Sequence, residues 1–288
     1  MPKSVKKNGT KKTNRGLSKN IVFVDNNQKL WKDDMSRFSD SMHYLRIKSD
    51  NVNAESGEES TYTMKMAMEG NRYASAIMAV IGPNMKSYSP NDGIDADVAK
   101  KLKTWASKVK GEKYALIDWD RTISCIEGIV PQAFQMGGSD KEFLDDAFVY
   151  LMRRDRIPHL KSLFRYLKAS GVNIHILTHN PYASVDSPYR PIFIEMMWRL
   201  FNDEDAQQKE YNYVENGVRV HVFQESSRAL FTVGREELEG MLHSTVDYTL
   251  PGKVLHKSNM VCHIIPNIKK CPRRKQNATR RVFLIRAI

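Results

Sequence analysis

Apolar and polar residues alternate along the second half of the chain in a pattern that predicts strands separated by helices. The runs 113–118 and 172–177 are short and apolar, which is typical of buried strands. Between them, residues 157–170 carry leucine and phenylalanine at helical spacing, and Gly171 follows as the predicted helix end. Later in the chain the pattern predicts two helices, at 191–201 and 236–243. It also predicts two strands, at 219–223 and 282–285. We therefore expect an α/β fold with a Rossmann-like, three-layer parallel sheet.

The first hundred residues have a weaker pattern. Residues 1–20 contain almost no large apolar side chains and are expected to form a disordered basic tail. A short apolar run at 21–24 predicts one strand, and the alternation of apolar residues from Tyr62 to Met68 favours another. The pattern divides the chain into a tail, a partly structured N-terminal extension and a core, at residues 1–20, 21–108 and 109–288.

Charge is concentrated at the two ends of the sequence. The formal net charge is +12, yet residues 1–20 hold seven Lys or Arg and no acid, and the stretch after Asp247 holds ten more and again no acid. Basic segments of this kind bind the phosphates of nucleic acids. The alternative is that they are solvated tails that aid solubility or nuclear entry.

Other features of the composition bear on location. The three cysteines are an odd number without CxxC spacing, which argues against a disulfide scaffold or a zinc ribbon and suits a reducing compartment. No apolar run reaches the roughly 18 residues that cross a bilayer, and the Lys-rich start lacks the apolar core of a signal peptide. We expect an intracellular protein of the cytoplasm or nucleus, with no membrane partner. The sequence does not indicate an oligomeric state.

Asp118 and Asp120 are the residues with the clearest chemical meaning, because they lie at the carboxyl end of the predicted strand at 113–118. Ligands of open α/β sheets bind at the carboxyl ends of the strands. Two nearby carboxylates repel each other, so a metal ion or a proton-transfer step explains the pair better than folding does. The alternative is a turn at the end of the strand with two capping acids.

Two segments together resemble a known family. The residues Asp118-Trp119-Asp120-Arg121-Thr122 at the end of one strand resemble the first motif (hhhDxDxT) of the haloacid dehalogenase-like (HAD) superfamily of phosphotransferases. Thr178, at the end of the next predicted strand, resembles the second motif. The resemblance covers about residues 111–181. The form DWDRT with the following Ile-Glu-Gly is also similar to HAD-like proteins of large DNA viruses, which makes a virus-associated location an alternative.

The resemblance implies a role for each matching residue. Asp118 would attack phosphorus and form an aspartyl-phosphate, and Asp120 would act as general acid and base, which favours a phosphatase. Thr178 would bind the transferring phosphoryl group, and its neighbours His179 and Asn180 would contact the substrate. Mg²⁺ would be held by the Asp118 carboxylate and the Asp120 backbone carbonyl.

Two further motifs of the family are less clear in this sequence. The lysine that neutralises the phosphoryl oxygens would be Lys253 or Lys257, and we prefer Lys257 because it could begin a helix. The fourth motif is a strand that ends in an acid and completes the Mg²⁺ site, but the strand predicted at 282–285 is followed by Arg286 and Ala287. Either an acid upstream of this strand supplies the missing ligand, or the site lacks it. The upstream candidates are Asp203, Glu225 and Asp247. A divergent, truncated or rearranged chain would each explain this departure.

The spacing of the motifs also bears on the substrate. Asp118 and Thr178 are 60 positions apart, and about 30 of these remain outside the core helix. We therefore expect a small or absent cap over the site. The resemblance implies a Mg²⁺-dependent phosphatase, and for such an enzyme an open site and basic ends favour a macromolecular substrate, either a phosphoprotein or a nucleic-acid end. The alternative is a catalytically impaired HAD-like scaffold or nucleic-acid-binding protein.

Overall fold

The computed structural model describes most of the chain. The described residues are 19–47, 58–82, 93–126, 129–137, 140–202, 233–249, 253, 256–265 and 268. The strands predicted at 219–223 and 282–285 lie outside these residues, as does nearly all of the predicted tail at 1–20.

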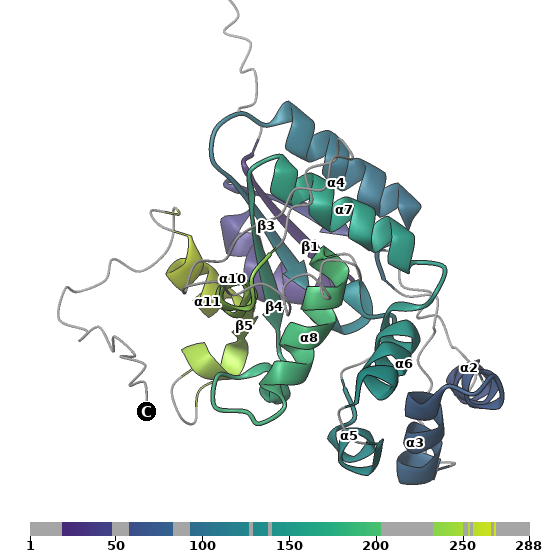
Figure 1. Ribbon diagram of the computed structural model, residues 1–288. Coiled ribbons are helices and arrows are strands. Elements are labelled where there is room, and N and C mark those ends of the chain that lie inside the picture. The colour runs from purple at the N-terminus through teal and green to yellow at the C-terminus, as the bar shows by residue number, and fades with distance from the viewer. Residues whose placement is uncertain are drawn as a thin grey trace, which may run out of the picture.

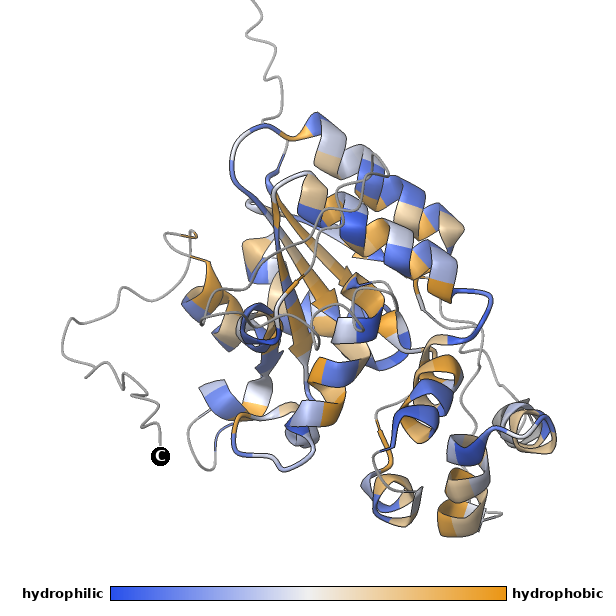
Figure 2. Cartoon of the chain, in the orientation of Figure 1, coloured by the Kyte–Doolittle hydropathy of each residue, from blue (hydrophilic) through white to orange (hydrophobic). Residues whose placement is uncertain are grey.

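A five-stranded parallel sheet forms the centre of the molecule (Figure 1). Its spatial order is β2-β1-β3-β4-β5. The strands are β1 (Ile21–Asp25), β2 (Met42–Arg46), β3 (Lys113–Asp118), β4 (Val172–Thr178) and β5 (Leu242–Ser244). The α/β class and the parallel sheet are therefore as predicted, and the strands are apolar on both faces because helices cover both (Figure 2).

The predicted boundary at residue 108 does not separate two units. β1 pairs in parallel with β3, so that Val24 lies opposite Ile117, and it also pairs with β2. Residues 21–46 thus contribute two of the five strands, and the interpretation of residues 21–108 as an extension beside the core was wrong for this part. Sequence patterns identify strands but not their partners, since strand pairing is decided by packing.

Helices lie on both faces of the sheet and make three layers (Figure 1). One face is covered by α4 (Ala96–Lys108), α7 (Ile157–Ala169), α8 (Arg190–Phe201) and α10 (Arg235–Met241). The other face is covered by α11 (Lys257–Ile264) and by the short turns that follow β1, α1 (Gln28–Leu30), η1 (Trp31–Met35) and η2 (Ser36–Phe38). The predicted helices at 157–170, 191–201 and 236–243 correspond to α7, α8 and α10, although the last ends earlier and leads into β5.

Four further helices pack together from two separate stretches of sequence. They are α2 (Glu58–Met68) and α3 (Arg72–Ile81), which precede β3, and α5 (Pro131–Gly137) and α6 (Lys141–Met152), which follow it. Tyr73 lies at their centre, with its ring centroid 4.9 Å from that of Phe134 and 5.4 Å from that of Tyr150. We call these helices the four-helix unit. It is larger than the small insertion expected after Asp118, because α2 and α3 add to it.

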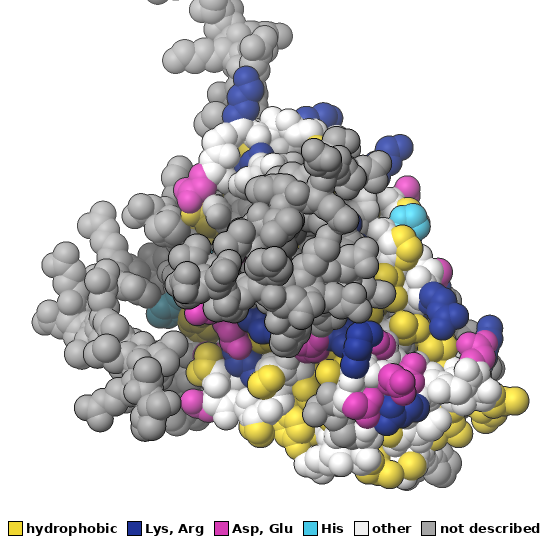
Figure 3. Space-filling view, in the orientation of Figure 1, with side chains coloured by type: hydrophobic (Ala, Val, Ile, Leu, Met, Phe, Trp, Pro, Cys, Tyr) yellow, Lys and Arg dark blue, Asp and Glu magenta, His cyan; other side chains and the backbone are white. Residues whose placement is uncertain are grey.

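The strand predicted from Tyr62 to Met68 is instead part of α2. Tyr62 and Met66 pack against the core, whereas Met64 and Met68 are exposed. Residues four apart lie on the same face of a helix, so the alternation of apolar residues fits a helix with one buried stripe as well as a strand. Figure 3 shows hydrophobic side chains at the surface of this part of the molecule, and Met78 and Met136 are exposed there too.

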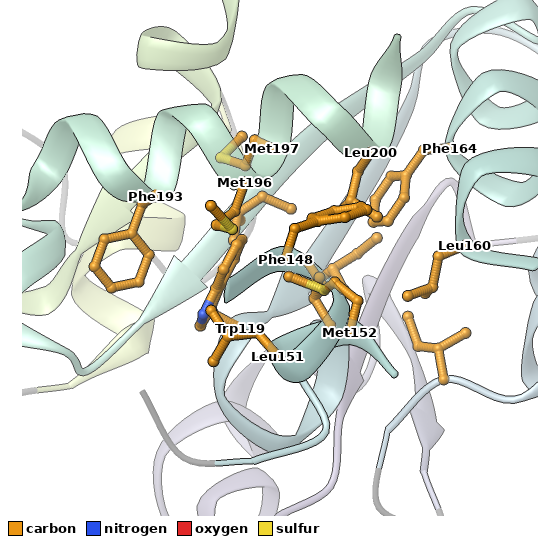
Figure 4. Packing of buried hydrophobic residues seen from close by; sticks show 14 of the residues in the cluster. Trp119, Phe148, Leu151, Met152, Leu160, Phe164, Phe193, Met196, Met197 and Leu200 are labelled. Carbon is orange, nitrogen blue, oxygen red and sulfur yellow. The ribbon is translucent and has the colours of Figure 1, made fainter. Parts of the chain in front are cut away.

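One hydrophobic core joins the four-helix unit to the layer of helices on the sheet (Figure 4). Phe148, Leu151 and Met152 of α6 lie beside Trp119 and the side chains of α8 in this view. The ring of Trp119 meets Phe193 of α8 edge to face at 5.2 Å. Trp119, the residue between Asp118 and Asp120, is therefore a core residue. Its packing fixes the start of the turn after β3.

Two findings concern the expected environment. No helix among the described residues is both long and apolar enough to span a bilayer. Cys262 is disulfide-bonded, although the cysteine spacing argued against disulfides as a scaffold. The intracellular location stays a prediction.

A half-buried polar chain crosses the face of the sheet that α11 covers. The Nδ1 of His175 on β4 lies 3.0 Å from Nε2 of His243 on β5, and Nδ1 of His243 lies 2.7 Å from the hydroxyl of Tyr248. Burial lowers the pKa of His175 to about 4 and that of His243 to about 3. Both rings are therefore neutral in the folded protein near pH 7.

We expect folding stability to fall as the pH falls from 6.5 towards 4. In this window the unfolded chain binds protons on His175 and His243 that the folded protein excludes, at a cost of up to about 1.4 kcal/mol per pH unit for each ring. Urea unfolding at several pH values measures this slope. The double variant His175→Gln/His243→Gln should have a shallower slope, and His159→Gln, a change at an exposed residue of α7, should keep it. An equal slope in the double variant would contradict the assignment.

Candidate functional site

The carboxyl ends of β1 and β3 form the place in this fold where a ligand site is expected. The two strands are neighbours, but the chain leaves β1 towards the face covered by α11, whereas the crossover helix α7 after β3 lies on the opposite face. Ligands of open α/β folds bind beside such a change of direction, at the carboxyl ends of the strands. Asp25 ends β1 and Asp118 ends β3, so both acids lie at this edge of the sheet.

Lys257, the first residue of α11, joins the two acids. Its Nζ donates to Asp118 Oδ1 at 2.5 Å and to Asp25 Oδ2 at 3.2 Å. All three residues are buried, with exposed fractions of 2% for Lys257, 6% for Asp118 and 0% for Asp25. A buried charge needs close partners, and here one ammonium serves two carboxylates.

The ionisation of this group follows from its burial. Loss of solvent raises the pKa of Asp118, and the negative charges of Asp25 and Asp120 raise it further, although Lys257 opposes both effects. The pKa of Lys257 is raised because the attraction of Asp118 and Asp25 outweighs the loss of solvent. Together with Asp120, the cluster holds three carboxyl groups around one ammonium, and further positive charge would favour the ionised form of Asp118.

The turn after β3 carries Asp120 towards β4. Within η4 (Trp119–Ile123), Arg121 has φ +57°, a conformation that is costly for a residue with a side chain. Asn26, the residue after Asp25, holds this turn by donating from Nδ2 to the Arg121 carbonyl at 3.1 Å. Thr122 donates from Oγ1 to Asp118 Oδ2 at 3.3 Å, which closes the turn.

Thr178 meets Asp120 directly. Its hydroxyl donates to Asp120 Oδ2 at 2.9 Å and accepts the backbone N–H of Asn180 at 3.0 Å. The two predicted motifs, 58 positions apart at these residues, are therefore brought together as expected. In this structure the Thr178 hydroxyl orients the proposed acid, a contact that the sequence did not suggest.

The other predicted substrate residues are engaged in local contacts. His179 Nδ1 lies 3.2 Å from Thr245 Oγ1, and burial lowers the pKa of His179 to about 4, with the nearby positive charge of Lys257 contributing. The side-chain oxygen of Asn180 caps η5 (Pro181–Ala183) by accepting the N–H of Tyr182 at 3.0 Å. Both residues lie at the end of β4, and their role towards a substrate stays a prediction.

The structure decides between some alternatives that the sequence left open. Lys257 and not Lys253 contacts Asp118, since Lys253 is exposed. Asp247 is held elsewhere, by the Ser184 hydroxyl and by the Val185 N–H at 3.2 Å. Asp203 and Glu225 lie outside the described residues, as do Arg286 and Ala287.

Asp25 is the site residue that sequence reasoning missed. The run Ile21–Asp25 is four apolar residues followed by an acid, and it resembles the run that ends in Asp118. That signal was present, but the acids predicted for this role were Asp203, Glu225 and Asp247, which all follow Asp118 in the sequence. Only the pairing of β1 with β3 brings Asp25 beside Asp118.

Comparison with known proteins adds no relative. No protein-family model, no curated protein and no solved structure matches the chain. Within the part of the chain that the structure describes, no three His, Cys, Asp or Glu side chains are grouped as a metal site. The chemistry of the site is therefore argued from its own residues.

We expect Lys257→Met to destabilise the fold by about 3 kcal/mol or more, because it leaves two buried carboxylates without their cation. Chemical denaturation measures the loss. Lys253→Met removes the same charge from an exposed position and should change stability little. Adding Asp25→Asn to Lys257→Met should recover part of the loss. Equal stability of the Lys257 and Lys253 variants would show that the ion pairs do not hold the site.

Proposed function

We propose that the protein is a Mg²⁺-dependent phosphatase of the HAD-like type, with Asp118 as nucleophile and Asp120 as general acid and base. The observation that carries this proposal is the triad Asp25–Lys257–Asp118 at the sheet edge. It supplies the lysine and the third acid that a site of this type needs. The acid lies upstream of the nucleophile in the sequence, which favours a rearranged order of strands over an impaired site.

The donor atoms at the site suit Mg²⁺. The carboxylates of Asp118 and Asp25 and the backbone carbonyl of Asp120 are hard oxygen donors, which Mg²⁺ prefers. The excess of carboxylate over ammonium favours a divalent cation electrostatically. Bound there, Mg²⁺ would offset the repulsion between the acids and the phosphate and stabilise developing negative charge.

The residues of the chain account for both halves of the reaction. An Asp118 carboxylate oxygen attacks phosphorus, the bond from phosphorus to the ester oxygen breaks, and Asp120 gives its proton to that leaving oxygen. Asp120 then takes a proton from water, which attacks phosphorus and releases phosphate and Asp118. Thr178 orients Asp120 throughout, and Lys257 supplies positive charge beside the nucleophile.

We propose a macromolecular phosphosubstrate, either a phosphoprotein or a nucleic-acid end. The basic ends of the chain support phosphate-rich partners. The exposed methionines of the four-helix unit also favour a large partner, since methionine-rich surfaces adapt to macromolecules. The four-helix unit would act as the cap, in place of the small one expected. An intracellular or virus-associated location fits the same proposal.

A catalytically impaired HAD-like binding protein is the second candidate. It is favoured by the absence of a three-acid metal group among the described residues, and by the position of Lys257 Nζ between Asp25 and Asp118. Such a protein would keep the ion pairs for stability alone, and it would neither bind Mg²⁺ nor turn over phosphate esters.

We expect Asp118→Asn to abolish Mg²⁺-dependent hydrolysis of an aryl phosphate while leaving the circular dichroism spectrum unchanged. Asp120→Asn should lower the rate about 100-fold or more, the scale of general acid catalysis. Steady-state hydrolysis measures both, and Asp33→Asn is the matched control because Asp33 is an exposed acid of η1. Wild-type turnover by Asp118→Asn would remove Asp118 as the nucleophile.

Mg²⁺ should raise the melting temperature of the wild-type protein, because a ligand that binds only the folded state stabilises it. The rise should be lost in Asp25→Asn and kept in Asp33→Asn, and differential scanning fluorimetry with and without Mg²⁺ measures it. A wild-type protein that neither responds to Mg²⁺ nor hydrolyses phosphate esters would favour the binding protein instead.

A further inference from the structure

The position of the Lys257 ammonium depends on the first turn of α11. The lysine side chain is long and has several rotatable bonds, so its backbone must be fixed if Nζ is to meet both Asp25 and Asp118. His256, the residue that precedes the helix, makes no capping hydrogen bond with its side chain. The first turn of α11 therefore needs another partner for its free N–H groups.

Asp34 supplies that partner from the connection between β1 and β2. Its Oδ2 accepts the backbone N–H of Ser258 at 3.3 Å, and its Oδ1 accepts the Ser258 hydroxyl. The two residues are 224 positions apart in the sequence, and both are buried. A carboxylate at the N-terminus of a helix is favourable because it satisfies N–H groups and meets the positive end of the helix dipole.

Two neighbouring contacts strengthen this arrangement. Arg37 of η2 donates from Nη2 to the Ser258 carbonyl at 3.1 Å. The Nδ1 of His256 lies 3.3 Å from Asp34 Oδ1. The segment that follows β1 thus contacts both neighbours of Lys257, namely His256 and Ser258. Lys257 itself donates to Asp25, the last residue of β1.

We propose that Asp34 is a positioning residue that holds Lys257 between Asp25 and Asp118 by capping α11 from the β1–β2 connection. Its importance for turnover rests on the proposed phosphatase function. Its effect on the Lys257 amine does not, because the amine is held by contacts that the structure shows in the absence of substrate. Removing Asp34 should therefore affect Lys257 more than removing an exposed acid such as Asp33, which changes only the overall charge of the protein.

Amine labelling tests the position of Lys257 without any need for activity. The full-length protein is treated with a short pulse of formaldehyde and cyanoborohydride, and the methylation of Lys257 is measured by mass spectrometry. In the wild type the buried amine should react slowly, and in Asp34→Ala it should react about tenfold faster, the scale of a lost helix cap. Asp33→Ala is the matched control, and Lys113, which donates to the Ala106 carbonyl at 3.2 Å, is the internal reference.

The outcomes of the labelling are distinct. Faster labelling of Lys257 in Asp34→Ala, with Lys113 and the Asp33→Ala protein unchanged, supports the proposal. Unchanged labelling of Lys257 overturns it, and so does an equal rise at Lys113, which would show general loosening. If Asp34→Ala does not fold, Ser258→Ala removes one of the two contacts and is judged by the same comparison. Asp34→Asn keeps one acceptor and should give an intermediate rate.

Turnover of an aryl phosphate then tests the link to function. A misplaced Lys257 should lower kcat by up to about 100-fold with a smaller change in KM, the cost of about 1 Å of misplacement at a reacting centre. If the wild type shows no hydrolysis, the proposed function fails while the labelling still decides the role of Asp34. If the wild type is active and Asp34→Ala labels faster yet keeps full kcat, the positioning role in catalysis is overturned.

Discussion

The ammonium of Lys257 between Asp25 and Asp118 is the contact on which the rest of the site depends. It joins three elements that are far apart in sequence, namely β1, β3 and the start of α11. Each of the three side chains would be costly to bury alone, and together they are stable only if the sheet order and the helix position are both correct. The fold and the candidate chemistry therefore depend on the same contacts, those of Lys257 Nζ with the carboxylates of Asp25 and Asp118.

The parallel sheet explains why these residues meet. Because all five strands run in one direction, every strand ends at the same edge, and the connections after β1 and β3 leave that edge on opposite faces of the sheet. Short connections bring the side chains of the candidate site to this edge. Asn26 holds the turn that carries Asp120, Thr178 orients Asp120 from β4, and Asp34 fixes the helix that carries Lys257.

The four-helix unit shows how the two halves of the sequence cooperate. Helices α2 and α3 come before β3 and α5 and α6 come after it, yet their aromatic side chains form one core around Tyr73. A unit assembled in this way cannot be recognised from the length of one insertion. Four of its methionines, Met64, Met68, Met78 and Met136, are exposed.

The sequence by itself determined the local elements and half of the site. Apolar runs and helical spacing identified β3, α7 and β4, and the motifs at their ends identified Asp118, Asp120 and Thr178, because these signals are local. Asp25, the choice of Lys257, the helical form of α2 and the place of residues 21–46 in the sheet were decided only by tertiary structure. Strand pairing and the burial of charges are long-range, since they depend on which distant segments pack together, and no local pattern records that choice.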